Sequence, residues 1–414
     1  MSGAADIVDW GPYVPLIAAL VSLLLGLAIG KAWERYKLRD GRWIDRRKAR
    51  DSQHYVLGLN FLVSGQIELA IEELSRAARV DADALEIHMI LGNVYRERGQ
   101  VSRAIQVHQA LLQRPKLTRL EHSYVLLCLG LDYKRGGFVD RAVDAFREVL
   151  RLSPDNQYAL LYLQKLFEEQ HQWAEAYRIR RRLVELSGPD TQPRNQAILG
   201  FLENALGAEA LAAERRDEAV RHFESAIALD SATTPAYLNL GDVRLQQGDT
   251  AGAIAAWNDL IDTAPERAHL ALERLERLYA SQGTPDRFVE RCRRFIAGRP
   301  HDWRVRLALG AHLARQGGHR AALDLLLEAL EQNPHGLGVH QAVWRVLMDL
   351  ELDRALVQRY IEAARGAVFF LDPHVCLKCH YRSTELLWQC PHCHEWNSFV
   401  EERIAAARQP SAEM

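Results

Sequence analysis

The chain has 414 residues, of which 48% are hydrophobic and 26% are charged, and its formal net charge at pH 7 is −2. This length exceeds one ordinary domain, and the near-neutral charge argues against wholesale binding of nucleic acid, which needs a global basic field. Six cysteines in a chain of this size do not make a disulfide scaffold. Four of them cluster within eighteen residues near the C-terminus, which suits a reducing compartment.

The first distinctive segment is apolar. Residues 10–30 carry no charge, and a helix over 14–33 would span about 30 Å, the thickness of the hydrocarbon core of a bilayer. Aromatic residues that suit the membrane interface flank it: Trp10, Tyr13, Trp33 and Tyr36. The competing interpretations are a buried helix and a cleaved signal peptide, but residues 1–30 contain no Lys or Arg. We therefore expect a short external segment over 1–13 and a transmembrane helix over 14–33.

A basic segment follows the predicted span. Between residues 31 and 50, three acidic residues stand against nine basic ones: Lys31, Arg35, Lys37, Arg39, Arg42, Arg46, Arg47, Lys48 and Arg50. The positive-inside rule then places the N-terminus outside and the rest of the chain in the cytoplasm. Because the segment over 34–51 lies beside the membrane, we expect it to contact anionic lipid headgroups rather than nucleic acid.

A repeating pattern occupies residues 52–366. Leu-Gly, followed by Ala twelve residues after the Gly, recurs at Gly58/Ala70, Gly92/Ala104, Gly130/Ala142, Gly207/Ala219, Gly241/Ala253 and Gly310/Ala322. Two of the intervals between successive glycines are 34 residues, which is the period of the tetratricopeptide repeat. The small residues mark where two antiparallel helices cross, and such a pair must stack on copies of itself to bury its apolar face. The pattern predicts an all-α tetratricopeptide-repeat solenoid of about eight units; an ordinary helical bundle is the alternative.

Some units depart from this pattern. The unit around Leu163 and Phe167 lacks the Gly, and residues 337–364 read as a terminal capping pair. A turn-rich break over 187–195 divides the array. Cys128 and Cys292 stand alone in repeat helices, so each is expected to be a small buried apolar residue.

The helical pattern stops at Gly366, and residues 367–375 predict a short strand that leads into a turn. Two CxxC motifs follow, ten residues apart: Cys376, Cys379, Cys390 and Cys393. Two such turns can close a tetrahedron of thiolates around one metal ion, whereas a redox dithiol would need one CxxC at a helix start. We predict a metal-binding module over 367–400 with these four cysteines as ligands. A tail with a fraying helix is expected over 401–414.

Four histidines lie near the two motifs: His374, His380, His392 and His394. Four cysteines already fill four coordination positions, so we expect these histidines to lie outside the ligand set. No motif of a catalytic site is present, neither HExxH nor GxSxG nor a Gly-rich phosphate loop. The sequence therefore predicts a protein that is not an enzyme.

Three segments carry a resemblance to a known family: LGLNFLVSGQIELAIEEL, LGNVYRERGQVSRAIQVHQALLQRPKLT and LWQCPHCHEW. Together with the anchor, the basic flank and the cysteine pairs, they resemble the lipopolysaccharide assembly protein B family of Gram-negative bacteria over essentially the whole chain. HQALLQRPKLT includes the four extra residues that separate Gly92 from Gly130 by 38 rather than 34. The chain departs from rubredoxin in having His380 and His394 where Gly usually follows each knuckle.

The resemblance implies a cytoplasmic adaptor of the inner membrane that restrains lipopolysaccharide synthesis. Such an adaptor presents the committed-step deacetylase of lipid A synthesis to a membrane-anchored AAA+ protease for degradation. By likeness to rubredoxin, the resemblance also implies iron at the four cysteines, although the spacing alone suits zinc equally. No nucleic-acid partner is implied, and the sequence leaves a homodimer open.

Other functions fit parts of the sequence. A rubredoxin-type electron-transfer protein would use the same four cysteines, but roughly nine tenths of the chain would then have no role. A membrane-tethered tetratricopeptide scaffold for another assembly pathway is the second alternative. A zinc-ribbon nucleic-acid binder is the third, and the loop TELLWQ between the knuckles argues against it because it contains no basic residue.

Overall fold

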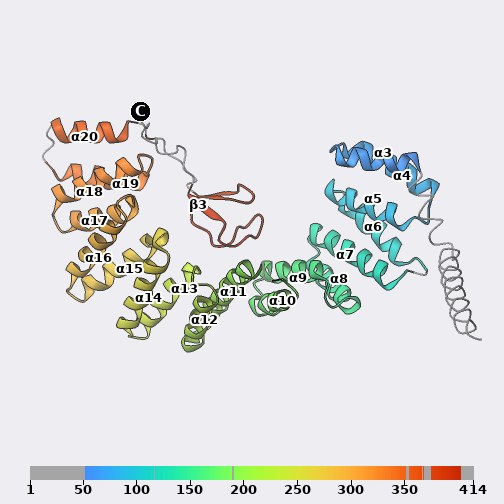
Figure 1. The fold of residues 1–414 in the computed structure, drawn as a ribbon, viewed down its shortest axis with the longest axis horizontal. Coiled ribbons are helices and arrows are strands. Elements are labelled where there is room, and N and C mark those ends of the chain that lie inside the picture. The colour runs from blue at the N-terminus through green and yellow to red at the C-terminus, as the bar shows by residue number, and fades with distance from the viewer. Residues whose placement is uncertain are drawn as a thin grey trace, which may run out of the picture. The chain divides into compact units, whose positions relative to one another are not determined.

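The computed structural model describes residues 52–115, 117–188, 191–350, 354–365, 367 and 374–401 (Figure 1). The predicted external segment, transmembrane helix and basic segment lie outside these residues, as does the tail beyond residue 401. Among the helices that are described, none is both long and apolar enough to cross a bilayer.

The chain divides into two compact units, residues 1–163 and 164–414. In the first unit, consecutive helices pack together in pairs, as the repeat pattern predicts. Its helices are α3 (Gln53–Val63), α4 (Ile67–Val80), α5 (Leu85–Glu97), α6 (Val101–Leu112), α7 (Arg119–Arg135), α8 (Val139–Leu152) and the first half of α9 (Gln157–Glu169). Thr118 begins α7 with a reciprocal capping box, because its hydroxyl accepts from the Glu121 N–H while the Glu121 carboxylate accepts from the Thr118 N–H.

The second unit continues the helical pairs from the second half of α9. Its helices are α10 (Trp173–Glu185), α11 (Gln192–Ala212), α12 (Arg216–Leu229), α13 (Thr234–Gln246), α14 (Thr250–Thr263), η3 (Pro265–Arg267), α15 (His269–Ser281), α16 (Pro285–Gly298), α17 (Trp303–Arg315), α18 (His319–Gln332), α19 (Leu337–Met348) and α20 (Arg354–Ala364). The break predicted over 187–195 is shorter than expected, because α11 begins at Gln192 with Pro193 in its first turn. Proline suits that position since its missing N–H has no partner within a helix there.

The glycine pattern has the predicted structural cause. Each glycine faces a side chain sixteen residues later, at the crossing of the two helices of its hairpin. A Cβ built on Gly241 would lie 2.1 Å from Trp257 Nε1, and one built on Gly207 would lie 2.5 Å from Phe223 Cε1. Only glycine allows the two backbones to approach this closely over a large side chain.

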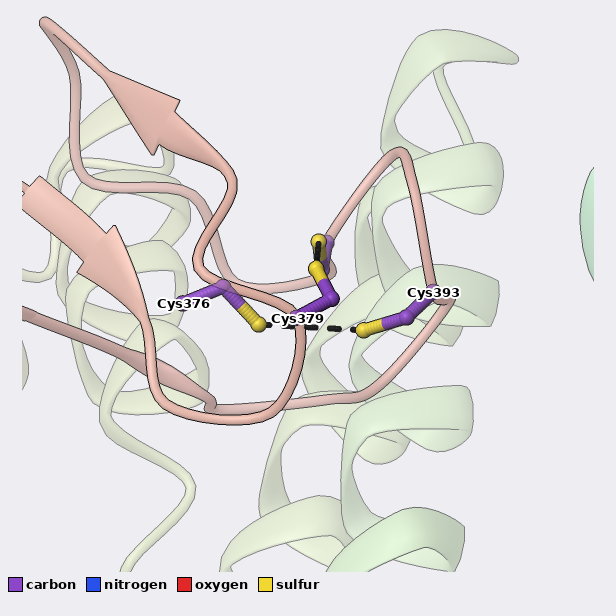
Figure 2. Close-up of side chains that lie close together, drawn as sticks. Cys376, Cys379 and Cys393 are labelled. Carbon is purple, nitrogen blue, oxygen red and sulfur yellow. Dashed lines mark hydrogen bonds between the residues drawn. The ribbon is translucent and has the colours of Figure 1, made fainter. Parts of the chain in front are cut away.

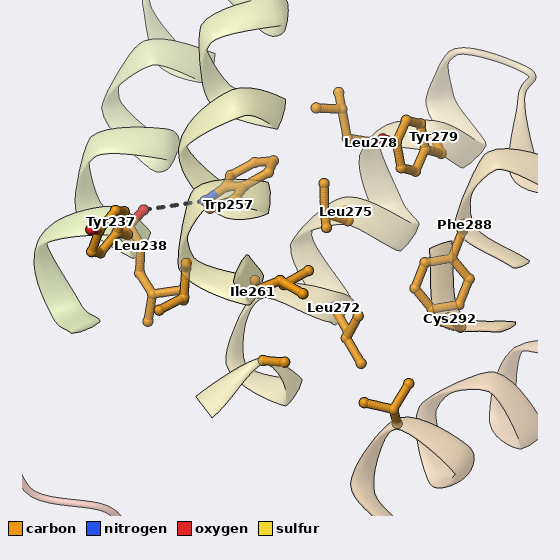
Figure 3. Close-up of a cluster of buried hydrophobic side chains, with 14 of the residues drawn as sticks. Tyr237, Leu238, Trp257, Ile261, Leu272, Leu275, Leu278, Tyr279, Phe288 and Cys292 are labelled. Atoms are coloured by element: carbon orange, nitrogen blue, oxygen red, sulfur yellow. Dashed lines mark hydrogen bonds between the residues drawn. The ribbon is translucent and has the colours of Figure 1, made fainter. Parts of the chain in front are cut away.

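The largest side chains fill the space between neighbouring hairpins. Trp257 is fully buried, and its indole N–H donates to the Leu238 carbonyl at 3.4 Å (Figure 3). Leu275 and Phe288 continue the same core into α15 and α16. Cys292 is part of this core, and burial raises the pKa of its thiol to about 12. The prediction that Cys128 and Cys292 are buried apolar residues is confirmed.

A small three-stranded sheet follows the array. Its strands are β1 (His374–Cys376), β2 (Arg382–Ser383) and β3 (Phe399–Glu401), in the order β2-β1-β3. Both neighbours pair with β1 in antiparallel fashion, so His374 lies between Ser383 and Glu401. The prediction of a helix starting at Glu401 was wrong at that residue. Glu401 pairs in the sheet, and its carboxylate also accepts hydrogen bonds from the Arg304 guanidinium.

We predict that Gly241→Ala destabilises the α13/α14 hairpin by about 1–3 kcal/mol, because the added methyl overpacks the Trp257 ring. Amide hydrogen exchange in these two helices measures the loss. The matched control is Gly298→Ala, since a Cβ there meets nothing within 4 Å. Unchanged exchange in Gly241→Ala would contradict this account of the crossing.

Candidate metal centre

Two tight turns bring four sulfur atoms together (Figure 2). The ligand atoms of Cys376, Cys379, Cys390 and Cys393 all lie within 4.8 Å of one another. Cys376 Sγ lies 3.7 Å from Cys393 Sγ, and Cys379 Sγ lies 3.6 Å from Cys390 Sγ. A tetrahedron with metal–sulfur bonds of about 2.3 Å has edges of about 3.8 Å. The four thiols therefore fit the coordination shell of one tetrahedral metal ion.

The backbone of the two knuckles follows the same pattern. The His380 N–H donates to the Cys376 carbonyl at 2.9 Å, and the His394 N–H donates to the Cys390 carbonyl at 2.8 Å. The two histidines have φ values of 59° and 55°, in the left-handed region. The position that is usually Gly in rubredoxin therefore keeps its left-handed backbone here, although a side chain in that conformation costs about 1–2 kcal/mol.

The thiols differ in acidity. Burial opposes ionisation of Cys376, but the Ser398 hydroxyl, 3.2 Å from its sulfur, and the backbone N–H groups of Cys379 and Lys378 outweigh that effect and lower its pKa to about 6. Burial, together with the neighbouring thiols, raises the pKa of Cys393 to about 12. One sulfur thus ionises readily, while four thiolates together need a cation to balance their charge. The chemistry of these donors fits a bound metal.

The neighbouring histidines add no ligand atom to the converging group, within the part of the chain that the structure describes. His394 Nε2 lies 3.3 Å from a Glu169 carboxylate oxygen, and His392 stacks on Tyr381 with ring centroids 6.4 Å apart. His374 belongs to β1. The ligand set that we predicted thus stays the four cysteines, with these histidines expected outside it.

The module packs on the helices of its own unit through Trp396. The Trp396 ring stacks on Phe201 of α11 with centroids 5.4 Å apart and also meets Trp173 of α10 at 6.3 Å. Its indole N–H donates to Glu168 Oε1 at 3.4 Å, and the Gln389 side-chain amide donates to Glu168 Oε2 at 2.9 Å. A glutamate of α9 therefore accepts hydrogen bonds from both sides of the second knuckle.

Charged residues surround this contact. Arg194 Nη2 donates to Glu395 at 2.8 Å, and Arg304 Nε donates to Glu401 at 3.1 Å. The Arg267 guanidinium lies over the Trp388 ring, 5.7 Å from its centroid. Sequence reasoning missed these residues because their partners are roughly 100 to 230 positions away along the chain and no local pattern joins them. Trp388 and Trp396 next to the knuckles were the available signal, since large aromatics in so small a module need a surface to pack on.

We predict that His380→Gly stabilises the loaded module by about 1 kcal/mol, because glycine adopts a left-handed backbone without steric cost. The midpoint of metal release during denaturation should rise. His380→Ala is the control, since alanine has to adopt the same φ and should gain nothing. Equal midpoints for the Gly and Ala variants would show that backbone strain at this turn has no effect.

Residues 374–401 match the family described as rubredoxin metal binding domain, and residues 55–116, 128–186 and 204–268 match the tetratricopeptide repeat. Lipopolysaccharide assembly protein B of Escherichia coli K12 is 27% identical over 386 residues, covering 92% of this chain and 97% of the relative. The protein of the same name from Haemophilus influenzae is 24% identical over 395 residues, with the same coverage. A solved tetratricopeptide repeat protein from Parabacteroides merdae is 15% identical with a TM-score of 0.34, covering 70% of this chain and 96% of that one. The chain is a homologue of lipopolysaccharide assembly protein B, with tetratricopeptide repeats and a rubredoxin-like metal-binding domain.

Proposed function

We propose that this chain is an adaptor of the bacterial inner membrane that regulates lipopolysaccharide biosynthesis from the cytoplasmic side. In this role it promotes degradation of the lipid A pathway deacetylase by a membrane-anchored AAA+ protease. The observation that carries the proposal is the similarity to lipopolysaccharide assembly protein B, which extends through the repeats and the four-cysteine module alike.

The repeat array supports a role in binding proteins rather than in catalysis. Stacked hairpins offer long surfaces on which several partners can lie at once. Large apolar side chains are exposed on both units, Tyr124 and Tyr158 on the first and Trp344 and Met348 on the second. Aromatic and methionine side chains of this kind are enriched in protein–protein interfaces.

We further propose that Cys376, Cys379, Cys390 and Cys393 hold one metal ion, iron by likeness to rubredoxin, with zinc as the other metal that suits four thiolates. The role of the metal is structural. The module has three strands of two or three residues each, too few to form a core that is stable alone. Thiolate coordination cross-links the two knuckles and so stabilises the surface that carries Trp396.

Residues 14–33 are proposed as the membrane anchor, with the N-terminus in the periplasm and the basic segment over 34–51 on anionic lipids. An anchor converts the encounter with a membrane-bound protease into a nearly intramolecular step. The gain in effective concentration is on the order of 10²-fold without any new contact.

We predict that a variant lacking residues 1–30 binds the deacetylase in solution but fails to promote its turnover in cells, because it loses the tether and keeps the array. The half-life of the deacetylase, followed after synthesis is blocked, measures this. An unrelated single span of the same orientation is the control, and it should restore at least part of the turnover. Turnover at the full rate without any span would contradict the tethering role, and failure of the full-length chain to shorten the half-life would contradict the proposed function.

A further inference from the structure

The fourth repeat replaces the usual pair at its helix crossing with two polar residues. In six other repeats, a glycine faces a side chain sixteen residues later, as Gly207 faces Phe223. The equivalent positions in the fourth repeat are Gln164 and Arg180. Both are buried, with 3% and 6% of their surfaces exposed. Buried polar side chains destabilise a helical pair unless they form hydrogen bonds, so the presence of Gln164 and Arg180 at this crossing needs a specific explanation.

The two residues lead to a third buried polar group. Arg180 Nη1 donates to Gln164 Oε1 at 3.4 Å, and Gln164 Nε2 donates to Glu168 Oε1 at 2.7 Å. Glu168 is only 3% exposed, and burial raises the pKa of its carboxyl group although the hydrogen bonds and the Arg180 charge oppose the shift. Gln164, Glu168 and Arg180 thus form one hydrogen-bond network that begins at the helix crossing and ends at the carboxylate beneath the module. We call this network the polar relay.

The metal module completes this relay. Gln389 and Trp396 supply hydrogen bonds to both oxygens of Glu168, and the two residues face each other as an antiparallel bridge. Gln389 directly precedes Cys390, and Trp396 comes three residues after Cys393. The turn that presents two of the four thiols therefore also holds the two donors at the spacing that Glu168 requires.

We propose that the polar relay of Gln164, Glu168 and Arg180 makes docking of the module onto α9–α11 depend on its metal. This inference rests on the metal assigned under the proposed function. With metal bound, the second knuckle is closed, Glu168 has all its donors, and Trp396 covers Phe201 and Trp173. Without metal, the knuckle no longer fixes the bridge between Gln389 and Trp396, so the buried charges of Glu168 and Arg180 favour hydration over docking.

The surface of α9–α11 that the module contacts would then be covered or exposed according to whether the metal is bound. In the metal-loaded protein, the module covers it. After metal loss, Trp173, Phe201 and Glu168 face solvent and become accessible to other proteins. An apolar pair such as Gly207 and Phe223 could not act in this way, because it supplies neither the amide donor nor the positive charge that Glu168 has beside it when the module is docked.

The test compares the wild-type chain with Gln164→Gly/Arg180→Phe, which installs the pair that the neighbouring repeats use. Hydrogen exchange of the full chain in detergent is measured with metal bound and after chelation under reducing conditions. In the wild type, metal removal should raise exchange over 164–169 and at the start of α11 by about tenfold or more, the loss of two hydrogen bonds to a charged group. The double variant should bind one metal per chain and yet show the raised exchange when loaded.

Loss of hydrogen-exchange protection in α13–α18 would show that the double variant has unfolded. A second variant tests the proposal in that case. Glu168→Gln keeps the shape but turns an amide N–H toward a donor, so it should raise exchange over the same residues in the loaded chain. Glu185→Gln is the matched control, since Glu185 is exposed and pairs with Arg182 on its own helix. It should leave exchange unchanged.

The outcomes separate the relay from the metal assignment. If the wild-type chain binds one metal but its hydrogen exchange over 164–169 is unchanged after chelation, the role of the polar relay is wrong and the metal site stands. Wild-type protection in both the loaded double variant and loaded Glu168→Gln would do the same. A wild-type chain that binds no metal would instead refute the metal site, and the relay with it.

Discussion

The close approach of two helices at each glycine is the constraint on which the array depends. A Cβ at Gly207 or Gly241 would collide with the aromatic side chain sixteen residues later, so these hairpins close only around a glycine. The large side chain then fills the space toward the next hairpin, as Trp257 does beside Leu275 and Phe288. Because no hairpin buries this side chain alone, each repeat draws its stability from its neighbours.

The fourth repeat shows what happens when this rule is relaxed. Gln164 and Arg180 stand in place of the glycine and the large side chain, and they form hydrogen bonds with each other, Asn195 and Glu168. Arg180 Nε stays buried without a hydrogen-bond partner among the described residues. Glu168 in turn needs the donors of the module. A local loss of core packing is thereby offset by a contact with residues more than two hundred positions later. The repeat that lacks the crossing glycine is therefore one of those that contact the module.

The repeat array and the convergence of the four cysteines followed from the sequence, because glycine spacing and CxxC spacing are both local patterns. The left-handed backbone of the histidines after each knuckle was not predicted, because histidine adopts a positive φ less readily than Gly. The docking of the module was not predicted either, since Glu168 and Trp396 are joined by no periodicity. The sequence showed that position 164 lacks the glycine of the repeat pattern. That Arg180 faces Gln164 across the helix crossing could be recognised only from the structure. Glu401 was assigned to a helix from its local sequence alone, which cannot show its strand pairing with the distant His374.

X-ray absorption at the metal edge of the full chain, purified without added metal, tests the account most directly. A tetrathiolate site predicts one metal per chain with four sulfur neighbours at about 2.3 Å and no lighter atom in the first shell. Nitrogen or oxygen neighbours, or fewer than four sulfurs, would contradict the assignment of Cys376, Cys379, Cys390 and Cys393. The structural role given to the second knuckle would then lose its basis.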